Sequence, residues 1–121
     1  MVFETNGIRI PLAYTLWAKR EILKQFKDAD GVQKAFSAGD EVELAENMAI
    51  FGSIMSKAYD MRTRLLNLSG NDAHPIESDD LFSLLTRAEV MQLVDAISKT
   101  VAEGNDTSVE VKGEKKDEAM Q

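Results

Sequence analysis

The clearest structural signal in the sequence is "DEVELAENMAIFGSIMSKAYDMRTRLLNL", from Asp40 to Leu68. Apolar residues recur in it at steps of three and four, which is the period of one face of an α-helix. Asp40 and Glu43 have the spacing of a capping box, and acidic side chains in a first turn suit the positive end of the helix dipole. The pattern predicts one long helix over about 41–68, roughly 42 Å in length. Such a helix either kinks near Gly52 or projects beyond its core.

The chain opens on "VFETNGIRIP", Val2 to Pro11, which has the pattern of a β-hairpin over residues 2–11. Asn6-Gly7 favours a two-residue type I′ turn, because both central positions of that turn need positive φ. The cross-strand pairs that this turn fixes are Thr5 with Ile8, Phe3 with Ile10, and Glu4 with Arg9. We expect the apolar face, Phe3, Ile8 and Ile10, to close one end of a helical core. The outer edges of the hairpin stay unpaired unless another strand adds to them.

Two further helices follow from capping signals. Thr15 is the expected N-cap of one helix, and Thr86 with Glu89 has the capping-box spacing ahead of another. Gly104 follows the last periodic residue and is expected to end that second helix. The expected bounds are about 15–27 and 87–103 for these helices, with short helical connectors at 32–38 and 81–85.

The elements indicate a mainly α (α+β) fold, with the N-terminal hairpin packed on a small helical bundle that contains one long central helix. A chain of 121 residues is long enough for one domain with a sizeable core, which we place at residues 1–104. Residues 105–121 are polar and charged, so we expect a flexible, disordered C-terminal tail with one short strand at 108–111.

The composition disfavours several classes of function. The net charge is −7, whereas binding to duplex nucleic acid normally needs a basic face, so no nucleic-acid partner is expected. No apolar run approaches the roughly 18 residues of a membrane span, so no membrane partner is expected either. There is no cysteine, and His74 is the only histidine, so the usual zinc sites cannot be built from this chain. The seven glycines are dispersed and form no phosphate loop. We therefore expect no enzyme, no catalytic residues, no metal and no cofactor.

Apolar side chains are the better candidates for function. Trp17 lies off the apolar stripe of its helix, so it either packs beneath a neighbouring element or fills a pocket of a partner. Met48, Met55 and Met91 lie in or near apolar stripes, where flexible thioethers suit surfaces that repack against irregular partners. Methionine is equally an ordinary filler of cores.

Three stretches follow one another in an order that resembles the tail assembly chaperones of long-tailed bacteriophages and prophages. They are "VFETNGIRIPLAYTLWAKREI", "LAENMAIFGSIMSKAY" and "HPIESDDLFSLLTRAEVMQLVDAISKTVAEG". A charged tail follows Gly104, so the resemblance covers nearly the whole chain.

The resemblance implies a non-enzymatic chaperone that binds the tape measure protein and keeps it soluble during assembly of the tail tube. Such a protein acts in the host bacterial cytoplasm and is not expected in the mature virion. The stripe that would cover apolar helices of the client, by helix-in-groove contact, is Met48, Phe51, Met55 and Tyr59.

The resemblance also implies a programmed ribosomal frameshift near the end of the reading frame, and the expected region is Lys115 and Lys116. The frameshifted extension would recruit the major tail tube protein. A second copy of the chain is a further candidate partner, because it could complete the hairpin sheet.

Two alternatives stay open. A structural head or tail completion protein would be retained in the virion. A small DNA-associated regulator would use the basic cluster of Lys19, Arg20, Lys24 and Lys27, which otherwise forms a solvated helix face.

Overall fold

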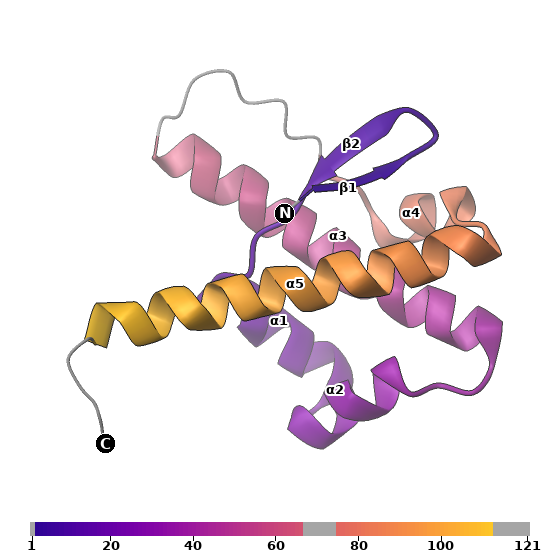
Figure 1. Ribbon diagram of the computed structural model, residues 1–121, viewed down its shortest axis with the longest axis horizontal. Coiled ribbons are helices and arrows are strands. Elements are labelled where there is room, and N and C mark those ends of the chain that lie inside the picture. The colour runs from indigo at the N-terminus through magenta and orange to yellow at the C-terminus, as the bar shows by residue number, and fades with distance from the viewer. Residues whose placement is uncertain (1, 67–74, 113–121) are drawn as a thin grey trace.

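The computed structural model describes residues 2–66 and 75–112, with side chains described as far as residue 104. The chain is mainly helical and begins with an antiparallel hairpin, as predicted (Figure 1). The elements are β1 (Val2–Thr5), β2 (Ile8–Pro11), α1 (Leu16–Phe26), α2 (Ala29–Phe36), α3 (Glu41–Leu65), α4 (Ser78–Leu84) and α5 (Arg87–Lys112).

The long helix α3 is the centre of the molecule. The Asp40 side chain accepts a hydrogen bond from the Glu43 backbone N–H at 3.2 Å, which confirms Asp40 as the N-cap. The helix is unbroken over 25 residues and its C-cap is Leu66, while positions 67 and 68 of the predicted helix lie outside the described residues. The other four helices and β2 all pack against α3, so its buried face forms most of the core.

Gly52 explains how three helices approach one another at the middle of α3. A Cβ added at Gly52 would lie 2.7 Å from Leu81 Cδ2 of α4 and 3.6 Å from Leu93 Cδ1 of α5. Leu81 and Leu93 are themselves buried. The absence of a side chain at Gly52 therefore makes room for both leucines at this junction.

The hairpin has the predicted register, with the expected cross-strand pairs confirmed. Asn6 and Gly7 have φ of 52° and 77°, as the two-residue turn requires. Phe3 and Ile10 are buried, but Ile8 is 39% exposed, so the expectation that Ile8 helps to close the core is wrong. Ile8 adjoins the turn, whereas Thr5, its cross-strand partner, is buried.

The turn end of the hairpin is anchored on the junction between α4 and α5. Thr5 Oγ1 donates a hydrogen bond to Glu89 of α5, and Asn6 Nδ2 donates to the Leu84 carbonyl at 3.2 Å. Within the described residues the sheet has two strands only, and residues 108–111, where a short strand was expected, are helical instead. These anchors, together with the core contacts of Phe3 and Ile10, hold a hairpin that would be marginal alone.

Glu89 makes this anchor sensitive to pH. Its carboxylate accepts hydrogen bonds from Thr5 Oγ1 and from the backbone N–H and side chain of Thr86, and these bonds, the first foremost, lower its pKa. The pKa of such a carboxyl is lower in the folded state than in the unfolded state. Its charge therefore stabilises the fold at pH values above the unfolded-state pKa, and this stabilisation is lost as the pH falls through the folded-state pKa. Glu89→Gln should therefore lower the melting temperature at pH 7, and the difference from the wild type should shrink towards pH 3.

Thermal unfolding followed by circular dichroism at both pH values measures this effect. Glu4→Gln is the matched control, because Glu4 forms only an exposed ion pair with Arg9 at 3.1 Å. A Glu89→Gln difference that stays constant from pH 7 to pH 3 would contradict a role for the Glu89 charge.

Capping residues set the bounds of the shorter helices. Thr15 caps α1 as predicted, through a hydrogen bond of 3.2 Å from the Ala18 backbone N–H. The connector expected at 32–38 is the helix α2, which begins earlier, at Ala29, because the Asp28 side chain accepts from the Gly31 N–H and acts as an N-cap. The second connector, α4, also starts earlier than predicted, at Ser78, although its N-cap Glu77 makes no side-chain capping hydrogen bond.

The predicted end of the last helix is wrong. Helix α5 continues through Gly104 to Lys112, so residues 105–112 of the predicted tail are helical, while 113–121 lie outside the described residues. A Cβ added at Gly104 would lie 2.8 Å from the Tyr14 backbone oxygen. Gly104 therefore permits a close contact with the segment before α1, and it does not serve as a helix stop.

Candidate partner-binding groove

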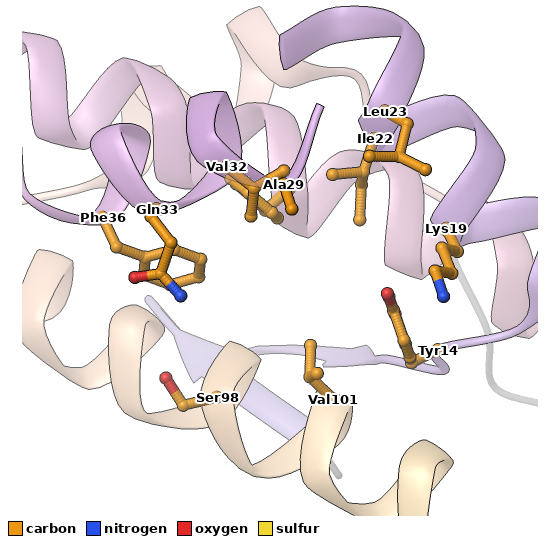
Figure 2. A pocket seen from close by; sticks show the side chains of 11 residues that line it. Tyr14, Lys19, Ile22, Leu23, Ala29, Val32, Gln33, Phe36, Ser98 and Val101 are labelled. Carbon is orange, nitrogen blue, oxygen red and sulfur yellow. The ribbon is translucent and has the colours of Figure 1, made fainter. Parts of the chain in front are cut away.

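An apolar groove of about 660 Å³ separates the α1–α2 pair from α5. One wall carries Ile22 and Leu23 of α1 with Val32 and Phe36 of α2, and the opposite wall carries Val101 of α5. Figure 2 shows the two walls facing each other, with the labelled side chains between them. All but Ile22 are only half-buried, so the apolar walls are accessible.

An aromatic cluster holds the α1–α2 wall in place. Phe51 of α3 stacks on Phe26 of α1 with ring centroids 5.0 Å apart, and it also contacts Phe36 of α2 at 4.9 Å. Asn47 of α3 donates a hydrogen bond to the Ala35 carbonyl at 3.3 Å. The α1–α2 pair and α5 are thus both built on α3, and Phe51 lies at the bottom of the groove between them.

Four polar side chains line the groove besides the apolar walls: Tyr14, Lys19, Gln33 and Ser98. Of the described residues that line it, Lys19 alone is charged. The Tyr14 hydroxyl and the Lys19 ammonium lie at the same end of the groove (Figure 2). Burial raises the pKa of Tyr14, so its hydroxyl stays protonated and able to donate.

The apolar surface continues along α5 past the groove. Met91, Val94, Ser98 and Val101 follow one another at steps of three, four and three, which places them on one face of the helix. Met91 is 61% exposed. The combined surface suits an elongated apolar ligand that lies along α5, such as one face of a helix.

Most of the stripe predicted to bind a client is core. Met48, Phe51 and Met55 are buried, so they cannot form an accessible surface in this structure, and that part of the site prediction is corrected. The physical reason is that the other four helices and β2 pack on α3, whereas sequence periodicity shows only that this face of α3 is apolar. Phe51 alone of the predicted residues reaches the groove, from below.

The remaining predicted site residues lie elsewhere. Trp17 and Tyr59 are half-buried, on α1 and α3, and neither lines the groove. Lys115 and Lys116, the predicted frameshift region, lie outside the described residues.

Apart from Phe51, the predicted site did not include the groove residues, although part of their signal is visible in the sequence. The apolar face of α5 is broader than the core contact needs. Leu93 and Ile97 on this face are buried, whereas Val94 and Val101 at its edge are half-buried. A broad apolar face indicates a second contact surface. The sequence does not show that the α1–α2 pair stands opposite that surface.

Comparisons of the chain with known protein families, with curated proteins and with solved structures found no match. Among the side chains that the structure describes, in residues 2–66 and 75–104, no group of three or more His, Cys, Asp or Glu is placed to hold a metal ion. Nor is any helix within residues 2–66 and 75–112 long and apolar enough to cross a membrane. The groove, with its accessible apolar walls, is the feature from which we infer a function.

Proposed function

We propose that this protein is a non-enzymatic binding protein that holds one face of a partner's amphipathic helix in the groove between α1–α2 and α5. The observation that carries the proposal is the apolar lining of that groove, open between two walls fixed on α3. Its volume falls in the range of about 300–1,000 Å³ that is usual for ligand pockets. The groove can accept a row of side chains at helical spacing, and Met91 extends the contact along α5.

The partner that fits the element order is the tape measure protein, and the function is that of a phage tail assembly chaperone. A long helical client exposes apolar stripes until the tail tube closes around it, so it needs a cover that binds reversibly. In this proposal the groove covers the apolar face of the client helix, in place of the α3 stripe that the sequence analysis predicted for this contact. The net charge of −7 would help to keep such a complex soluble.

Co-expression with a phage tape measure protein tests the proposal. We expect the soluble fraction of the client to rise when the wild-type chain is present. Ser98→Trp should abolish that rise, because Ser98 is exposed on the α5 wall and an indole there would fill the groove. Lys99→Trp is the matched control, since Lys99 is an exposed neighbour on α5 that does not line this groove.

Two results would contradict the proposal. One is an equal insolubility of the client with and without the wild-type chain. The other is stoichiometric presence of the protein in purified virions, measured by mass spectrometry, which would favour a structural completion protein. A slippery heptamer at the codons for Lys115 and Lys116, with an overlapping downstream frame, is the separate test of the frameshifted extension.

A further inference from the structure

One end of the groove presents two hydrogen-bond donors. The Lys19 ammonium is a donor only, and the Tyr14 hydroxyl is protonated and able to donate. No hydrogen bond or ion pair joins either group to another side chain among the described residues. Both groups line the same apolar groove at the same end (Figure 2). Among the described side chains that line the groove, a ligand meets donors at this end and no carboxylate.

The charges around Lys19 show why it stays available. Glu21 is the acidic residue nearest in sequence, and its carboxylate is already held by Arg20 at 2.9 Å and by Lys24 at 3.3 Å. Residues 16–38, which build the α1–α2 wall, contain five basic and three acidic side chains, although the whole chain is acidic. The wall is thus locally basic, and Lys19 is its unneutralised charge inside the groove.

We propose that the partner helix presents a glutamate or aspartate beside its apolar stripe, and that Lys19 and Tyr14 bind this carboxylate while the stripe lies in the groove. This inference rests on the proposed function and specifies the client. The acceptor that suits one ammonium and one hydroxyl is a carboxylate, through charge-assisted hydrogen bonds. The carboxylate would fix the direction and register of a helix that the apolar walls alone would let slide.

The open form of the groove favours a helix as the source of the carboxylate. Ala29 and Gln33 on one side and Ser98 on the other are exposed, so the ligand keeps a solvent-facing side. An amphipathic helix has such a side, whereas a free fatty acid needs closer enclosure of its chain.

The test selects helical peptides from a pool for binding to the full chain. The apolar stripe of the pool is randomised among Leu, Ile, Met and Phe, and the flanking positions among Glu, Gln and Lys. We expect Glu to be enriched at one flanking position. Changing that Glu to Gln in a selected peptide should weaken binding by about tenfold, measured by fluorescence anisotropy.

Variants of the protein locate the effect. Lys19→Gln should cause the same loss for the Glu peptide and no further loss for its Gln version, while Tyr14→Phe should cause a smaller loss. Lys34→Gln removes the same charge from an exposed position of α2 outside the groove lining, and it should leave binding unchanged. The control matters because a net charge of −7 by itself would favour basic peptides.

The outcomes separate this inference from the proposed function. If Ser98→Trp abolishes binding of the selected peptides but Glu is not enriched in them, the carboxylate contact is overturned. The groove then remains a helix-binding site. An absence of binders from the whole pool would overturn both. The chain could instead bind dodecanoate saturably, in a way that depends on Lys19, and bind no helical peptide. That result would assign the two donors to a lipid carboxylate and overturn the proposal that the partner is a helix.

Discussion

Phe51→Ala should lower the free energy of unfolding by about 3–5 kcal/mol, the range observed when a buried aromatic side chain is truncated to alanine. Phe51 is buried in α3 and its ring contacts Phe26 and Phe36, so it joins α3 to both helices of one groove wall. The substitution removes burial and aromatic contact together and leaves a cavity at the bottom of the groove. Urea unfolding followed by circular dichroism measures the loss.

Val42→Ala is the control for this prediction, because Val42 is 55% exposed on the same helix. We expect its effect to stay within about 0.5 kcal/mol, as is usual for surface positions. A Phe51→Ala protein of unchanged stability that no longer binds its partner would contradict the core position of Phe51. It would instead support the α3 stripe as the client surface.

Gly52→Leu should lower the free energy of unfolding by about 3 kcal/mol, at the upper end of the usual cost of overpacking a core. The new Cβ alone would lie 2.7 Å from Leu81 Cδ2, and the rest of the side chain would have to enter the space that Leu81 and Leu93 occupy. Leucine is a better helix former than glycine by about 0.8 kcal/mol, so helix propensity alone predicts that Gly52→Leu would stabilise the protein. We therefore expect α4 and α5 to be displaced from α3, and chemical unfolding with a probe of tertiary structure detects this.

Gly39→Leu is the matched substitution. Gly39 is exposed, lies outside the helices, and has no atom within 4 Å of an added Cβ. We expect stability within about 0.5 kcal/mol of the wild type. An equal loss in the two variants would show that removal of a glycine, and not crowding at the three-helix junction, is the cause.

The elements that local chemistry specifies could be predicted. The Asn6-Gly7 turn fixes the hairpin register because positive φ is a property of those two residues, and Asp40 and Thr15 cap their helices through their own side chains. Gly104 shows where such reasoning fails. A glycine after a periodic stretch looks like a helix stop, but here it is needed for the close approach of Tyr14, which is 90 positions away in the chain.

The candidate site could not be predicted in the same way, because it depends on which apolar faces are covered. Periodicity identifies the stripe of Met48 and Met55 and equally the face of Val94 and Val101, and it does not distinguish a face that is covered from one that is open. The tertiary structure buries the first beneath the elements that pack on α3 and leaves the second bordering a groove.

The helical class, the hairpin with its register, and the N-caps Asp40 and Thr15 could be read from the sequence, because each depends on backbone preferences and hydrogen bonds within a few residues. The burial of Phe51, the passage of α5 beyond Gly104, and the placement of Lys19 and Tyr14 at one end of an apolar groove follow from the tertiary packing. Burial is a relation between elements distant in the chain, so the spacing along any one of them cannot specify it.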